Sequence, residues 1–319
     1  MININYLYVL LLCFHLNLYS QDARKYCDAA IQYSLNNQLE EALNSIDKAI
    51  YIGDRKDLPL FYFHKYEYLV KLQKFTPAIK TLNLALAIFP NSILLLNTRA
   101  EFYLALKVYK KSIFDYEKIT ALVNKTELKN YSLKLASVKF VIRDFKGVSF
   151  IIKSILKSDP LNIEAQNLLA ALHIEYSDFT KAIQILNVLA KQHPKSLSTI
   201  INLGYAYQKN KQHINAITCF NRALNLSPNN PYALCNRAFS KFKISEIDGA
   251  LLDINSSISL LPSNSYAYKV RGQIYLSLNR IKNACLSFTF AQKLNFSEQY
   301  GPKVNELLAK HCSVSLVVR

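Results

Sequence analysis

The amino-acid sequence predicts an all-α fold, a solenoid of about eight antiparallel helix pairs followed by one further helix. Three observations lead to it: small residues recur with a period close to 34, apolar residues follow one another at steps of three and four, and structure-breaking residues are few. The 319 residues include 6 Gly and 9 Pro, while 51% are hydrophobic. Strand-rich folds need many more turns than so few breakers provide.

The period is followed along one position near the start of each predicted second helix. The residues there are Ala42, Ala78, Ser112, Val148, Ala182, Ala216, Ala250 and Ala284, separated by 36, 34, 36, 34, 34, 34 and 34 residues. We therefore expect a repeat array over residues 21–298, with extra residues in the loops that close the first and third repeats. The expected repeats are 23–58, 59–92, 93–128, 129–162, 163–196, 197–230, 231–264 and 265–298.

The sixth repeat, residues 197–230, illustrates the helix pair. Its apolar residues recur with the helical period on both sides of a polar turn at residues 209–213. Gly204 and Ala216 are expected where the two helices come closest, and Phe220 fills the space above that contact. Pro228 ends the second helix, because proline cannot continue a helix and disfavours helical geometry in the residue before it.

This order of small residues, ring, bulky apolar residue, Ala and terminal Pro resembles the tetratricopeptide repeat family. In the sixth repeat it is carried by Leu203, Gly204, Tyr207, Ala216, Phe220, Ala223 and Pro228. Elsewhere the match is looser, with Tyr66 and Val148 at small-residue positions and Asp54, Asn124 and Phe296 at proline positions. The resemblance implies a right-handed superhelix whose concave face is lined by the first helix of each repeat.

The segment 299–319 is predicted to be a capping helix and tail. Gly301 and Pro302 open it, and Val304, Leu307 and Leu308 form one helical face. Such a helix covers the apolar flank that the last repeat would otherwise expose to water.

Residues 1–20 have the pattern of a secretory signal peptide. An apolar run over residues 6–14 is followed by the small residue Ser20 before the first charge, Asp22. His15 and Asn17 interrupt a stretch already shorter than the roughly 20 residues that a bilayer requires. We expect an exported protein, periplasmic or extracellular, cleaved near Ser20; an uncleaved membrane anchor and a cytoplasmic chain are the alternatives.

A chain cleaved at Ser20 keeps five cysteines: Cys27, Cys219, Cys235, Cys285 and Cys312. An odd number leaves at least one thiol without an intramolecular partner. Their wide spacings match no zinc pattern, so the preferred interpretation is small buried apolar residues, with Cys219 and Cys235 as the pair to check.

The sequence shows no arrangement of residues for catalysis, metal binding or a cofactor. The six histidines lack the spacing of a helical zinc site, and six scattered glycines form no phosphate-binding loop. We therefore expect a protein that is not an enzyme and has no catalytic residues, metal or cofactor.

The candidate function lies in the groove lined by the first helices of the last three repeats. Aromatic rings beside lysines are typical of a binding surface, because rings give large contact areas and lysines attract carboxylates. An alternative is that some rings, Phe239 and Phe242 above all, belong to the core. The candidate partner-binding residues are Tyr205, Gln208, Lys209, Tyr232, Phe239, Phe242, Lys243, Tyr266, Lys269 and Gln273.

These patterns favour a non-catalytic scaffold that binds a segment of another protein in its concave groove. The net charge of +17 supports an alternative, the binding of an anionic envelope polymer or membrane headgroups by the basic C-terminal half. Residues 197–298 carry 11 basic and 4 acidic groups, although a composition rich in Lys and Asn is also what an AT-rich genome produces. Nucleic acid is disfavoured, since no binding motif appears. A structural spacer within a larger complex is the third reading.

Overall fold

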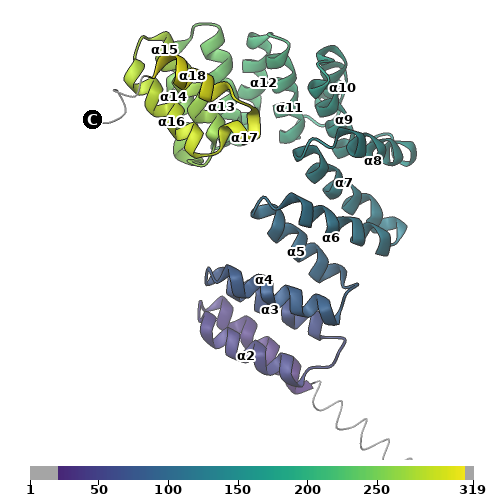
Figure 1. Cartoon of the computed structure of the whole chain (residues 1–319). Coiled ribbons are helices and arrows are strands. Elements are labelled where there is room, and N and C mark those ends of the chain that lie inside the picture. Colours follow the sequence, from purple (N-terminus) through teal and green to yellow (C-terminus); the bar gives the residue numbers. More distant parts are fainter. Residues whose placement is uncertain (1–20, 313–319) are drawn as a thin grey trace, which may run out of the picture. The chain divides into compact units, whose positions relative to one another are not determined.

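The computed structural model describes residues 21–312, and every regular element in that range is a helix (Figure 1). This confirms the predicted all-α solenoid of helix pairs. The signal peptide expected at residues 1–20 and the tail at 313–319 lie outside the described residues. The chain divides into two compact bodies, which we call the N-terminal body (to residue 151) and the C-terminal body (from residue 152).

The N-terminal body consists of consecutive helix pairs. A helix over residues 21–35 is followed by α2 (Leu39–Ile52), α3 (Leu58–Lys71), α4 (Phe75–Ile88), α5 (Ile93–Ala105), α6 (Tyr109–Leu122), α7 (Lys125–Val141) and the start of α8 (Phe145–Ser158). From α2 to α7 each helix packs on the next, and α3 also touches α5. The first helices α3 and α5 of neighbouring pairs are therefore adjacent, as in a solenoid.

The C-terminal body repeats this arrangement. Its pairs are α9 (Ile163–Glu175) with α10 (Phe179–Gln192), α11 (Leu197–Lys209) with α12 (His213–Leu226), α13 (Pro231–Lys243) with α14 (Ile247–Leu260), and α15 (Ser265–Ser277) with α16 (Ile281–Lys293). The first helices touch in order, α9 with α11, α11 with α13 and α13 with α15. No helix among the described residues is both long and apolar enough to cross a membrane.

The turn inside each pair contains one residue in the left-handed backbone conformation. These residues are Asn37, Gln73, Lys107, Arg143, Ser177, Lys211, Ser245 and Asn279, with φ between 57° and 67°. Each of them lies five positions N-terminal to one of the small residues that define the period in the sequence, so the two sets have the same spacing. In the sixth pair the Gln212 N–H donates to the Tyr207 carbonyl at 2.9 Å, which closes the first helix with the bond of a Schellman turn.

Glycine permits the closest helix contact in the sixth and eighth pairs. A Cβ placed on Gly204 would lie 2.7 Å from Cε1 of Phe220, and one on Gly272 would collide with the ring of Phe288. The aromatic ring therefore packs directly against the glycine.

The third repeat accommodates its extra residues in a helix and not in a loop. Helix α7 is 17 residues long and begins at Lys125, ahead of the expected repeat boundary at residue 128. Asn124 caps it, since its side-chain oxygen accepts from the backbone N–H groups of Thr126 and Glu127 at 3.0 and 3.1 Å. The asparagine that replaces the expected proline thus starts the next helix early.

The cap on the last pair consists of α17 (Phe296–Tyr300) and α18 (Lys303–His311). Phe296 and Val304 are buried against the core of the eighth pair, with Leu307 and Leu308 partly buried beside them. Asn295, with φ of 58°, turns the chain directly before Phe296, which has the position of the proline in earlier repeats. The apolar flank of α16 is therefore covered.

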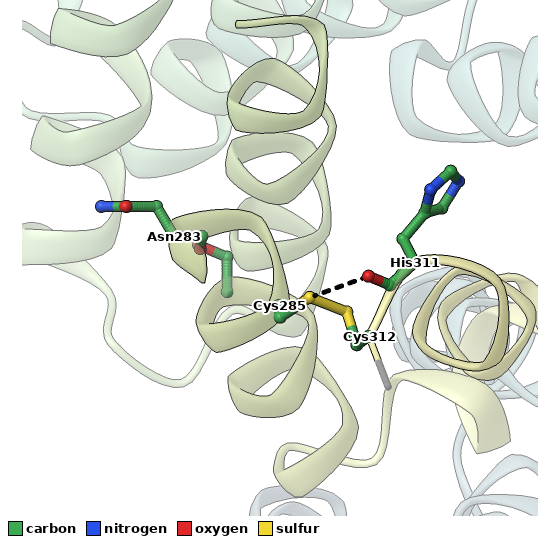
Figure 2. Close-up of a disulfide and its surroundings, with 5 residues drawn as sticks. Asn283, Cys285, His311 and Cys312 are labelled. Carbon is green, nitrogen blue, oxygen red and sulfur yellow. Dashed lines mark hydrogen bonds between the residues drawn. A yellow bond between two sulfur atoms is a disulfide. The ribbon is translucent and has the colours of Figure 1, made fainter. Parts of the chain in front are cut away.

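A disulfide joins Cys285 of α16 to Cys312, directly after α18 (Figure 2). This corrects the interpretation of all five cysteines as unpaired apolar residues. Sγ of Cys285 also lies 3.7 Å from the carbonyl oxygen of His311, a contact without a hydrogen because the sulfur is in a disulfide. Cys27, Cys219 and Cys235 are free and buried, so the pair suggested by the sequence, Cys219 with Cys235, is not bonded.

Candidate functional site

The candidate site lies on the first helices α11, α13 and α15 of the C-terminal body, which touch one another in that order. Side-chain caps fix the starts of α13 and α15: the side-chain oxygen of Asn230 accepts from the Ala233 N–H at 2.9 Å, and that of Asn264 accepts from the Tyr266 N–H at 3.2 Å. Such caps set the helix register, and thereby decide which side chains face the groove.

A cavity of about 220 Å³ opens on this surface, and we call it the tyrosine pocket. Its wall includes three of the predicted residues, Tyr205, Tyr232 and Tyr266, one from each first helix. Tyr232 is 57% exposed, so its ring is available to a partner. The full lining is Tyr205, Tyr232, Cys235, Asn236, Asn264, Tyr266 and Tyr300.

Tyr300, on α17, was not anticipated as a site residue. Its ring lies 5.6 Å from that of Tyr266 and 4.9 Å from that of Phe296. The C-terminal cap therefore contributes a wall of the pocket. No repeat-based signal could identify it, because Tyr300 follows the last repeat and has no equivalent in the earlier ones.

Three predicted lysines lie against aromatic rings of these helices, two of them against tyrosines of the pocket, and we call Lys209, Lys243 and Lys269 the lysine row. Nζ of Lys209 lies 5.3 Å from the ring centre of Tyr205. Both Lys243 and Lys269 approach the ring of Phe239, at 5.4 and 5.5 Å. Cation–π contacts of this kind hold each ammonium group against an aromatic face.

Burial and charge shift the pKa of two groups here. Burial, then the neighbouring ammonium of Lys243, lowers the pKa of Lys269 to about 8. Burial is also the main cause that raises the pKa of the Tyr266 hydroxyl, which stays protonated at all ordinary pH values. The tyrosine pocket therefore offers hydroxyl groups, and the lysine row offers positive charge.

The two predicted phenylalanines are half-buried. Phe239 and Phe242 pack against the core between α13 and α15, and Nζ of Lys243 lies 5.4 Å from the ring centre of each. The edge of the Phe239 ring meets His213, with centroids 6.2 Å apart. These two rings were predicted to be either groove residues or core residues. They pack on the core and also contact ammonium groups of the lysine row.

Gln208 was predicted to bind a partner, but its side chain is buried. Only 5% of it is exposed, and its amide nitrogen donates to the Asn236 carbonyl at 2.8 Å and to Oγ of Ser240 at 2.9 Å. It ties α11 to α13 from inside and is not available to a partner. Gln273 is only partly buried, but its side-chain oxygen has no hydrogen-bond partner among the described residues.

No group of three or more His, Cys, Asp or Glu side chains that could hold a metal ion occurs within residues 21–312. The groups that gather at the site are phenols, amides and ammonium groups, which suit recognition by contact area, hydrogen bonds and charge.

Two stretches of the chain, residues 164–196 and 199–230, match sequence models of the tetratricopeptide repeat. They coincide with the pairs α9–α10 and α11–α12. A comparison with curated proteins gives no match.

Solved structures resemble the chain in fold. A tetratricopeptide repeat protein from Parabacteroides merdae ATCC 43184 is 17% identical, with a TM-score of 0.52, and the match covers 92% of this chain and 100% of that one. A thermophilic protein of the same repeat class from Thermus thermophilus is 18% identical, with a TM-score of 0.50 over 59% of this chain and 100% of that one.

A chain of the APC/C hetero-tetramer Cut9–Hcn1 is 12% identical, with a TM-score of 0.62, and the match covers 89% of this chain and 55% of that one. Likeness at these identities concerns the fold. The two matched repeats and the regular spacing of the turns support a protein of the tetratricopeptide repeat family.

Proposed function

We propose that the protein is an exported, non-catalytic scaffold that binds a segment of another protein on the surface formed by α11, α13 and α15. Tetratricopeptide repeats generally mediate protein–protein interactions, and that general role is the starting point. The observation that carries the proposal is the tyrosine pocket, where Tyr205, Tyr232 and Tyr266 come together from three successive repeats.

The composition of this surface supports binding. Tyrosines supply a large contact area with few rotatable bonds and a polar tip, and residues of this type dominate the energetics of protein interfaces. The surface is also preorganised, because Tyr205 and Tyr266 are half-buried and pack against the hydrophobic core. A partner that enters the pocket therefore loses little free energy to ordering the scaffold.

Export is supported by two features. Residues 1–20 carry the signal-peptide pattern, and the Cys285–Cys312 disulfide suits an oxidising compartment, where such bonds persist. Determination of the N-terminal residue of the protein from its native cells tests this part of the proposal. A chain that still begins at Met1 contradicts cleavage.

Photocrosslinking in the native cells tests the binding surface. We would place a photoreactive phenylalanine analogue at the exposed position Tyr232 and, as a matched control, at Tyr51 of α2, which is 90% exposed. The expected result is a discrete protein adduct from position 232 that is absent from position 51. Equal adducts at both positions, or none at position 232, would overturn the assignment of the surface.

A further inference from the structure

The lysine row lacks counter-charges. Within residues 21–312, no carboxylate lies within ion-pair distance of Lys209, Lys243 or Lys269. Other basic groups of the same body do have such partners: Arg237 and Lys241 share the carboxylate of Asp253. The row is therefore a set of positive charges that the fold holds together without neutralising them.

The lysine charges also shift the pKa values of neighbouring groups. The lowered pKa of Lys269 follows first from burial and then from the charges of Lys243, Lys209 and Lys303, opposed in part by Cys235. His213, at the start of α12, also has a lowered pKa, caused by burial and by Lys243. The pKa values of Lys269 and His213 are thus both lowered by burial and by positive charges near the Phe239 ring. A bound anion would reduce this repulsion.

The tyrosine pocket decides which kind of anion fits. A polyanionic polymer presents charge at every unit and has few apolar groups, so it would leave a 220 Å³ cavity lined by four tyrosines unfilled. A peptide can place an acidic side chain next to an apolar one. The pocket also offers Asn236, on the helix between the other two, to a peptide backbone.

We propose that the groove binds an acidic peptide segment, with an Asp or Glu carboxylate held by Lys243 and Lys269 and a neighbouring apolar side chain in the tyrosine pocket. This inference rests on the proposed function, since it names the chemistry of the partner that the same surface takes. Both ammonium groups lie near the ring of Phe239, with Nζ to ring-centre distances of 5.4 and 5.5 Å, and the proposed carboxylate binds between them.

Binding would be coupled to protonation. A carboxylate beside Lys269 raises the pKa of its ammonium from about 8 toward the ordinary value, so the complex takes up a proton above pH 8 and the affinity falls as the pH rises. The titratable groups that surround Lys269 are Lys209 and Tyr205 of α11, His213 of α12, Lys243 and Cys235 of α13, Tyr266 of α15, Tyr300 of α17 and Lys303 of α18.

A displayed library of random 12-residue peptides, selected on the purified full chain, tests the proposal. We expect enriched peptides with Asp or Glu next to aromatic or aliphatic residues. Enriched peptides without acidic residues would overturn this inference while the proposed function stands. If no peptide is enriched, or if dextran sulfate binds in place of any peptide, both fail.

Lysine variants then test which ammonium group binds the carboxylate of the selected peptide. Lys269→Met should weaken the selected peptide by roughly tenfold or more, the loss typical of a hydrogen bond to a charged group. Lys282→Met, which removes an exposed charge on α16, is the matched control and should leave the affinity unchanged. The affinity of the unmodified chain should decline between about pH 7.5 and 9.5, on either side of the lowered pKa, and that of Lys269→Met should decline less. A flat profile, or equal effects of both substitutions, contradicts the proposal.

Discussion

Arg237 and Asp253 form a two-bond ion pair between the helices of the seventh repeat, with Nε to Oδ2 at 2.7 Å and Nη2 to Oδ1 at 2.6 Å. The third nitrogen, Nη1, donates to Asn221 of the preceding repeat at 2.8 Å. Arg99, Asp115 and Asn83 form the same network four repeats earlier. Each arginine thus joins its own helix pair to the previous one.

The two ion pairs should differ in their sensitivity to loss of the arginine. At Asp253 the ammonium of Lys241 remains at 3.0 Å, whereas Tyr103 occupies the position equivalent to Lys241 near Asp115. Arg99→Ala should lower the free energy of unfolding by about 3 kcal/mol, because it leaves a fully buried carboxylate without its cation, and Arg237→Ala should cost less. Denaturant unfolding of both variants measures this. A larger loss for Arg237→Ala would contradict the role of Lys241.

Gly204→Ala should destabilise the protein although alanine is the better helix former. The added methyl collides with the Phe220 ring, and overpacking of this kind costs about 1–3 kcal/mol. Gly249→Ala is the matched control, since its methyl would meet the Lys241 side chain at 3.3 Å, a contact that a small shift relieves. Thermal unfolding followed by circular dichroism should show a lower midpoint for the first variant and an equal or higher one for the second.

Lys211→Gly should stabilise the protein. Lys211 has φ of 61°, and a left-handed conformation costs a residue with a side chain about 1–2 kcal/mol, more than the added chain entropy of glycine. We expect a net gain of roughly 0.5–1 kcal/mol. Arg222→Gly, at an exposed position within α12 of the same repeat, should instead lose about 1 kcal/mol. The difference in sign between these two glycine variants, measured by denaturant unfolding, is the decisive result.

Reduction of the disulfide should loosen the C-terminal cap. The bond closes a loop of 27 residues, and a crosslink over such a length typically contributes about 3 kcal/mol. Hydrogen exchange of α18 should accelerate in dithiothreitol, while exchange in α11 stays slow. The variant Cys285→Ser with Cys312→Ser should exchange quickly with or without the reductant. Unchanged exchange in the reduced wild type would show that apolar contacts alone hold α18.

Alkaline pH should destabilise the fold through its free cysteines. Burial raises the pKa of Cys27 and Cys219 to about 11 and that of Cys235 to about 12, from an ordinary value of 9.0. The folded chain therefore keeps protons that the unfolded chain releases, and stability is lost as the pH rises above 9. The lowered pKa of Lys269 has the opposite effect, since it raises the free energy of unfolding between pH 8 and 10.5. The combined loss from the three thiols is larger than this gain from one amine.

Denaturant titrations at about pH 8 and pH 10.5 check this expectation. The free energy of unfolding should fall between the two values, and the fall should be smaller in Cys235→Ala. The alanine variant also separates the thiol effect from other alkaline effects, because it removes one titrating group and leaves the lysines in place. Equal slopes for the two proteins would contradict the assignment.

Much of the fold can be predicted because the period fixes which residues meet inside a helix pair. The positions of Ala216 and Ala250 predict the helices around them, and the left-handed residues of the turns have the same spacing. What those turns contain could not be predicted. Lys211 and Ser245 occupy a conformation that glycine favours, and their side chains give no local signal of it.

The site was less predictable because it depends on how successive pairs meet. Gln208 has the sequence position of a groove residue, yet its amide turns inward to Ser240 of the next repeat. Tyr300 reaches the pocket only because the chain reverses after α16, and Cys285 and Cys312 are too far apart in sequence for their pairing to be read from spacing. Contacts between repeats, and between the array and its cap, are set by tertiary packing.

The Cys285–Cys312 bond also determines how the fold meets a mechanical load. A pull on the C-terminal end enters the structure at Cys285, inside α16, and bypasses α18. In an array whose repeats hold only their neighbours, pulling normally peels the terminal helix first. Here the outermost helix carries no tension until the bond is cut, so in an oxidised chain residues 286–311 add no length when the last repeat yields.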